Sequence, residues 1–108
     1  MSRLRIPSSV SAVPESENVL RFMSRVGKEI GSVSDTSLGD LVRLDLGPHI
    51  VARGDVLSPG FRRGLALDAR LCYSTERADR VAVLRLLNDM AAAWDAHRRS
   101  AATWNGAR

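Results

Sequence analysis

The sequence contains few of the residues that build metal sites. Among its 108 residues are one cysteine, Cys72, and two histidines, His49 and His97. A single cysteine excludes an internal disulfide, and its position in an alternating apolar segment is typical of a small half-buried side chain in a reducing compartment. A metal site would need further ligands beside a histidine, which the neighbouring residues do not supply convincingly. We therefore expect no metal site.

The common catalytic and cofactor-binding motifs are also absent. There is no Gly-x-Ser-x-Gly turn and no Gly-x-Gly-x-x-Gly loop after a strand. Gly27-Lys28-Glu29 lacks both the upstream glycine and the following serine or threonine of a phosphate-binding loop. These absences predict a protein that is not an enzyme, with no catalytic residues and no cofactor.

Long apolar runs are missing as well. No segment reaches the length of a transmembrane helix, and Arg3 and Arg5 precede no hydrophobic stretch of the kind that forms a secretory signal. The length suits one core. We therefore expect a cytoplasmic protein without a membrane partner, with a flexible leader over 1–13, a single domain over 14–104 and a tail over 105–108.

The positive charge of the chain lies near its ends. The net charge is +4, yet the span from Glu15 to Asp95 holds eleven basic against twelve acidic residues, a net charge of −1. A nucleic-acid-binding domain normally gathers its basic residues on one face of the folded body. The interspersed charges of this span argue against that class.

The N-terminal half predicts a helix and two strands. Pro14 suits a first helical turn, and apolar residues from Val19 to Val33 recur at helical spacing, which predicts a helix over about 15–31 that Gly31 could cap. A loop over 32–40 precedes an alternating strand over about 41–46, with a short helix from Ser37 as the competing interpretation. A weaker strand over 49–56 follows, and then a turn at 58–60.

The two clearest periodic signals follow one another in the C-terminal half. Apolar residues alternate with mostly polar ones from Leu65 to Tyr73, which predicts a strand with one buried face. Ser74 and Thr75 can cap a helix, Glu76 favours its first turn, and the period then changes to about 3.6 as far as Trp104. A helix of about 30 residues would outrun so small a domain, so its last turns should project.

Together these elements predict an α+β fold: a helix, a three-stranded antiparallel meander and a long C-terminal helix. Two helices cover only one face of such a sheet. The other face or an edge is then available as an interface.

The segment LALDARLCYSTERADRVAVLRLLNDMAAAWDAHRR, from Leu65 to Arg99, resembles the last strand and last helix of the class I type III secretion chaperones of bacteria. The resemblance covers about a third of the chain and depends on its periodicity and on Ala93-Trp94. It implies a small α+β homodimer that binds an extended segment of another protein by strand addition. The chaperones are usually longer and acidic, which this chain is not.

We therefore predict a chaperone-like or adaptor domain that self-associates and binds a partner protein. Tryptophan is enriched at binding hot spots, and the candidate contacts on the long helix are Met90, Trp94, His97 and Trp104.

Two alternative functions stay open. The first is a nucleoid-type nucleic-acid-binding protein with phosphate contacts from Arg62, Arg63, Arg98 and Arg99. The second is a phage or mobile-element inhibitor of a host protein.

Overall fold

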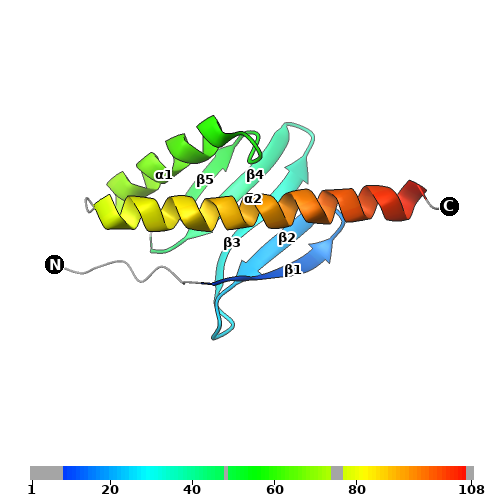
Figure 1. The fold of residues 1–108 in the computed structure, drawn as a ribbon, viewed down its shortest axis with the longest axis horizontal. Helices are drawn as coiled ribbons and strands as arrows, with labels where there is room; N and C mark the ends of the chain where they lie inside the picture. Colours follow the sequence, from blue (N-terminus) through cyan, green and yellow to red (C-terminus); the bar gives the residue numbers. More distant parts are fainter. Residues whose placement is uncertain (1–8, 48, 74–76, 107–108) are drawn as a thin grey trace.

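Five strands precede two helices in the computed structural model, which describes residues 9–47, 49–73 and 77–106. The elements are β1 (Ser11–Ser16), β2 (Val19–Met23), β3 (Glu29–Thr36), β4 (Gly39–Asp45), β5 (His49–Arg53), α1 (Pro59–Tyr73) and α2 (Arg77–Gly106) (Figure 1). The predicted class, α+β, is confirmed. The predicted order of one helix, three strands and one helix is wrong, because the sheet has five strands and both helices follow it.

Some predictions fall outside the described part of the chain. They concern leader residues 1–8, the capping residues 74–76, tail residues 107–108 and the side chains of Cys72 and Trp104. β1 begins at Ser11, within the segment predicted as the leader.

The sheet is a meander in which each strand pairs antiparallel with the next, in the order β1-β2-β3-β4-β5. Short turns make this possible. Gly27 and Gly39 take φ angles of +83° and +109° at the β2–β3 and β3–β4 turns, a backbone region that glycine enters without steric cost. The Thr36 hydroxyl further ties the second turn together, because it donates to the carbonyl oxygen of Gly39.

The helix predicted over 15–31 is wrong. This segment forms the end of β1, all of β2 and the start of β3. Leu20 and Phe22 are buried while Arg21 between them lies on the other face, a period of two. Val26, which fitted the helical spacing, is 89% exposed in the turn. Short apolar patterns fit both periods, and pairing with neighbouring strands decided between them.

The strand predicted over 65–73 is also wrong, because this segment belongs to α1. Leu65, Ala66 and Ala69 are buried and Leu67 is exposed, which is a helical pattern. The segment Pro59–Tyr73 contains no valine, isoleucine or threonine, the residues that favour strands. Ser58 caps the helix, since its hydroxyl accepts the N–H of Phe61, and Pro59 occupies the first turn.

Three predicted elements are confirmed. β4 and β5 match the strands predicted over 41–46 and 49–56, although β5 ends at Arg53, and the short helix from Ser37 is excluded. α2 matches the long C-terminal helix, and its last turns continue past the edge of the sheet (Figure 1). Within the described residues, neither helix is both long and apolar enough to cross a bilayer.

The hydrophobic core lies between one face of the sheet and the two helices. The largest fully buried side chains are Trp94, Phe22, Leu20, Leu44, Leu87, Met90, Val33, Val42, Val56 and Val83. Gly31, predicted as a helix cap, instead lies in β3. A Cβ atom there would stand 2.6 Å from the carbonyl oxygen of Arg43 and 3.1 Å from the Met90 methyl group. Glycine therefore allows both the close approach of the β4 backbone and the packing of Met90 from α2 on the sheet.

Candidate functional site: the open face of the sheet

The face of the sheet that the helices leave uncovered, here called the open face, carries a regular array of side chains. The strand register aligns one row across all five strands and a second row beside it. The first row is Val13, Arg21, Ser32, Arg43 and Val51; on β2 to β5 the second is Val19, Ser34, Leu41 and Arg53. Large side chains therefore flank the two serines of the central strand.

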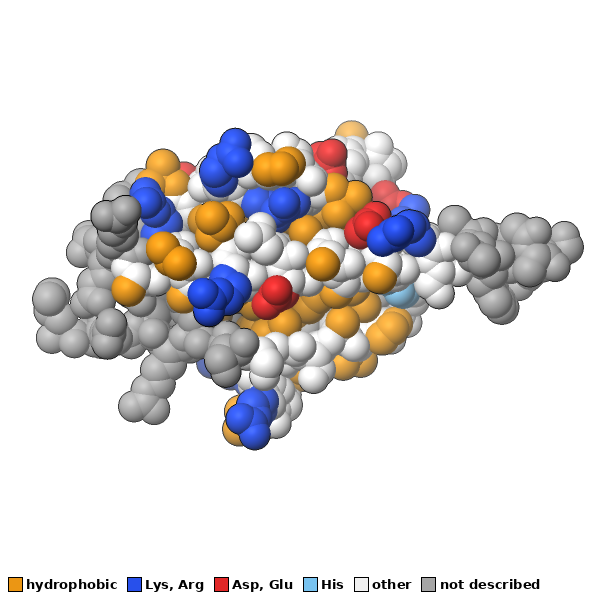
Figure 2. All heavy atoms as spheres, viewed as in Figure 1, with side chains coloured by type: hydrophobic (Ala, Val, Ile, Leu, Met, Phe, Trp, Pro, Cys, Tyr) orange, Lys and Arg blue, Asp and Glu red, His pale blue; other side chains and the backbone are white. Residues whose placement is uncertain are grey.

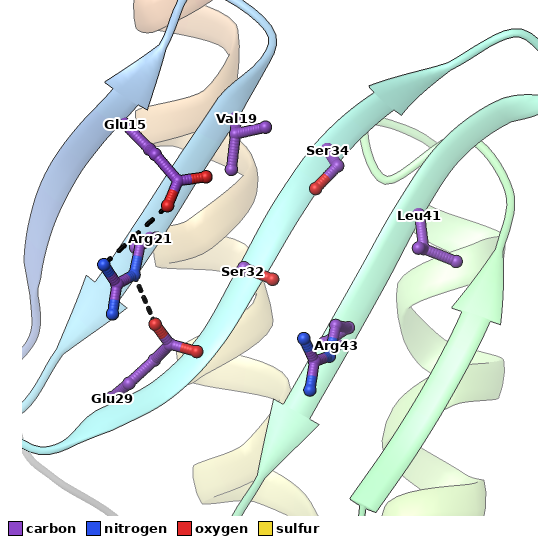
Figure 3. A pocket seen from close by; sticks show the side chains of 8 residues that line it. All are labelled: Glu15, Val19, Arg21, Glu29, Ser32, Ser34, Leu41 and Arg43. Atoms are coloured by element: carbon purple, nitrogen blue, oxygen red, sulfur yellow. Dashed lines mark hydrogen bonds and ion pairs between the residues drawn. The ribbon is translucent and has the colours of Figure 1, made fainter.

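This difference in size hollows the open face along β3. The hollow, here called the groove, has a volume of about 410 Å³. Figure 3 shows Ser32 and Ser34 between side chains of β2 on one side and of β4 on the other. The residues that line the groove are Glu15, Val19, Arg21, Glu29, Ser32, Ser34, Leu41 and Arg43. Its floor is small and polar, and its walls mix aliphatic and charged groups.

Ser32 is the one buried polar residue among the described residues, with 6% of its surface exposed. No described group forms a hydrogen bond with its hydroxyl. A buried hydroxyl without a partner costs roughly 1–3 kcal/mol relative to a satisfied one. The groove floor therefore offers a hydrogen-bonding group that the described part of the fold does not satisfy.

At the β2 wall, Arg21 of β2 forms a compact cluster of ions with Glu15 of β1 and Glu29 of β3. The Arg21 Nε donates to Glu29 Oε1, and its Nη1 lies 3.8 Å from Glu15 Oε1 (Figure 3). The hydrogen bond and charge of Glu29, followed by the charge of Glu15, raise the pKa of Arg21. Two carboxylates share one guanidinium, so this wall carries a net charge of −1.

The β4 wall carries the opposite charge. Arg43 is exposed and has no ion-pair partner among the described residues. Beyond it on β5, Arg53 donates to the Thr36 hydroxyl over 3.4 Å. The groove thus separates a negative wall from a positive one.

The candidate contacts on α2 lie on the other side of the sheet. Met90 and Trp94 are 0% and 2% exposed inside the core, which leaves them no surface for a partner in this conformation. The His97 Nε2 lies 3.0 Å from the carbonyl oxygen of Ser16, so this ring contacts the β1–β2 turn. Of the four predicted contacts, the side chain of Trp104 lies outside the described part.

The arginines predicted to contact phosphate do not form one cluster. Arg62 donates to Asn88 and to the carbonyl oxygen of Val56. Arg98 forms a 2.9 Å ion pair with Asp35, and Arg99 pairs with Asp95. Since Asn88 and Arg98 are ten residues apart on α2, the two pairs are separated by roughly 15 Å along the helix.

A second hollow of about 340 Å³ lies between the outer surfaces of the helices. It is lined by Arg63, Ala66, Leu67, Arg80 and Leu84. Figure 2 shows this side of the molecule, where basic side chains alternate with small apolar areas. Several neighbouring side chains are outside the described part, so we place the candidate site on the open face.

Outside the groove, the described residues offer few clusters of titratable or metal-binding side chains. Among the described residues, no group of three histidine, cysteine or acidic side chains is placed to hold a metal ion. Burial raises the pKa of Asp40, and the charges of Asp35 and Asp55 add to this effect. The hydrogen bond from the Trp94 indole N–H acts in the opposite direction. Asp40 lies at the contact of β4 with α2, away from the groove.

No protein-family model matches the chain, and neither a curated protein nor a solved structure is significantly similar to it. The site is therefore defined by its geometry alone. The groove does not follow from the sequence prediction, which places residues 15–31 in a helix. The alternation over 41–46 does predict β4, the strand that carries Leu41 and Arg43, but not that these residues line a groove.

Proposed function

We propose that the protein is a binding module that docks a partner protein on the open face of its sheet. The observation that carries this proposal is the one-sided fold, in which both helices cover the same face, while the other face is hollowed and no other described element covers it (Figures 1 and 3).

The composition of the open face supports a protein partner. Val13 and Val51 are 43% and 55% exposed at its two sides, and Val19 and Leu41 line the groove between them. Apolar groups interspersed with arginine are typical of protein interfaces. Both carboxylates of the groove are paired with Arg21, an arrangement that favours a binding surface over general acid–base catalysis.

The same composition disfavours single-stranded nucleic acid. Sheets that bind such strands stack bases on exposed aromatic side chains. The aromatic side chains that the structure describes, Phe22, Phe61 and Trp94, belong to the helix-covered side of the molecule. The acidic β2 wall would also repel a phosphate backbone.

The proposal keeps one part of what the chaperone resemblance implied, an extended segment of a partner. It does not keep strand addition, because the groove lies over β3, which already pairs with β2 and β4. The strand in that resemblance, over residues 65–73, is a helix in this fold.

Site-specific photocrosslinking tests the proposal. Val51 on the open face and Val81 on α2 have nearly equal exposures, 55% and 52%, and each can be replaced by p-benzoylphenylalanine in cells of the source organism. We expect a discrete adduct with another protein from position 51 and none from position 81.

Absence of an adduct at position 51 would contradict the proposal, and so would two other results. An adduct from position 81 alone would show that the partner binds the helices and not the open face. An adduct of twice the mass of the chain would assign the open face to self-association.

A further inference from the structure

The groove on the open face combines the donors that bind a carboxylate. We propose that it takes an extended peptide segment of the partner and that Arg43, Ser32 and Ser34 bind an acidic side chain of that segment. This inference rests on the proposed function and specifies the chemistry of the ligand.

Register places the three groups within reach of one ligand. Ser32 lies directly opposite Arg43, and such cross-strand neighbours have Cβ atoms about 5 Å apart. Ser34 follows two residues later on the same face of β3, and Figure 3 shows both hydroxyls inside the groove. A carboxylate above the floor can therefore accept hydrogen bonds from the hydroxyls and from the guanidinium together.

Two independent observations indicate that this donor set is unsatisfied. Ser32 is 6% exposed and its hydroxyl has no partner among the described residues. Arg43 has no carboxylate partner in the same part of the chain, whereas Arg21 on the facing wall has two. A ligand carboxylate would satisfy both groups at once, and charge-assisted hydrogen bonds are the strong ones.

The width of the groove suits a single extended chain. Its walls belong to β2 and β4, which are two strand spacings apart, about 10 Å. The floor follows β3, so a segment lying along it would place alternate side chains toward the two walls.

The two walls also select the charge of that segment. The β2 wall, with Glu15 and Glu29 around Arg21, has a net charge of −1 and favours a basic side chain next to the acidic one. A uniformly negative ligand such as a nucleic acid would meet repulsion there. The structure thus favours a peptide of mixed charge over a polyanion.

The test is a selection of random dodecapeptides, displayed on phage, against the full chain. We expect binders whose addition shifts the amide resonances of β2, β3 and β4 and in which one position is enriched in aspartate or glutamate. Arg43→Gln and Ser32→Ala should each weaken such a peptide, the former by about tenfold. Arg53→Gln, an arginine on the same face outside the groove, should not.

A double-mutant cycle separates a direct contact from a change in folding. If the peptide's acidic residue is replaced by its amide, Arg43→Gln should cause no further loss of affinity. The inference is overturned if no peptide binds at β2 to β4, if binders lack the acidic enrichment, or if they bind Arg43→Gln as tightly as the native chain. Decathymidylate competing at the same amides would also overturn it.

These failures are distinguishable from failure of the proposed function. A crosslinked partner from position 51 together with peptides indifferent to Arg43 would retain the docking surface and discard the carboxylate site. Absence of a crosslinked partner at position 51 would contradict both the docking surface and the carboxylate site.

Discussion

Replacing Gly31 or Gly64 by alanine should change the free energy of unfolding in opposite directions. A Cβ atom at Gly31 would lie 2.6 Å from the backbone oxygen of Arg43, whereas one at Gly64 in α1 would have no atom within 4 Å. We expect Gly31→Ala to lower the free energy of unfolding by about 1–3 kcal/mol, since the backbone of β4 or the contact with Met90 must move.

Gly64→Ala is the matched control and should raise the free energy of unfolding by about 0.5–1 kcal/mol, because alanine restricts the unfolded chain and favours a helix. Urea denaturation of both variants measures the difference. Equal effects of the two substitutions would show that the close approach at Gly31 does not constrain the fold.

The free energy of unfolding should depend on pH through the carboxyl group of Asp40. Burial raises the pKa of Asp40 in the folded chain above its ordinary value of 3.8, which applies to the unfolded chain. Between the unfolded-state pKa and the folded-state pKa, the folded chain therefore holds more protons than the unfolded chain. The contribution of Asp40 to the free energy of unfolding therefore falls as pH rises through this range and is largest below 3.8.

Asp40→Asn should remove this decline, because the amide stays neutral and its oxygen still accepts from the Trp94 indole. Above the range we expect the variant to be more stable by no more than about 1 kcal/mol, since the site is only half-buried and solvent screens the charge. Thermal unfolding from pH 3 to 7 measures this. Parallel curves for the variant and the native chain would contradict the assignment.

At the scale of elements, Arg98 joins the last third of α2 to the sheet. It donates to the carbonyl oxygen of Glu17 and to Asn18 Oδ1 at the β1–β2 turn, pairs with Asp35, and lies 5.5 Å from the centre of the Trp94 ring. Arg98→Ala should lower the free energy of unfolding by about 1–2 kcal/mol.

Arg99→Ala provides the comparison, since Arg99 pairs only with Asp95 on the helix surface among the described residues. Its effect should stay within about 0.5 kcal/mol. Hydrogen exchange of the β1–β2 turn should accelerate in the Arg98 variant alone. Equal losses would contradict the role of Arg98 in fixing this turn.

The element assignments show where sequence periodicity is sufficient. It identified β4 and α2, because the alternation over 41–46 and the helical seam from Val83 to Trp104 each fit one period clearly. The weaker strand prediction over 49–56 also matched β5. Periodicity failed over 15–31 and 65–73. There Val19, Phe22 and Leu65 fit two periods, and the deciding signals were the turn at Gly27 and the cap at Ser58.

At the scale of the whole molecule, the distribution of charge predicts weak interaction with nucleic acid. The span from Glu15 to Asp95 has a net charge of −1, and Arg62, Arg98 and Arg99 are engaged within the fold. With a short DNA duplex, light scattering should show any complex dissolving between about 50 and 200 mM salt.

The same light-scattering measurement reports the mass of the free protein. Twice the mass of one chain would confirm the predicted homodimer, and the mass of a single chain would contradict it. A duplex complex that persists at the higher salt would contradict the protein-binding proposal and restore nucleic acid as the partner.

The sequence by itself determined the class of the fold, the long amphipathic helix and the absence of familiar catalytic motifs, since these follow from local period and residue type. Only the tertiary structure decided the candidate site. Ser32 became a buried floor and Arg21 and Arg43 became facing walls through the pairing of β2, β3 and β4. That pairing depends on contacts between residues distant in the chain, which no local pattern contains.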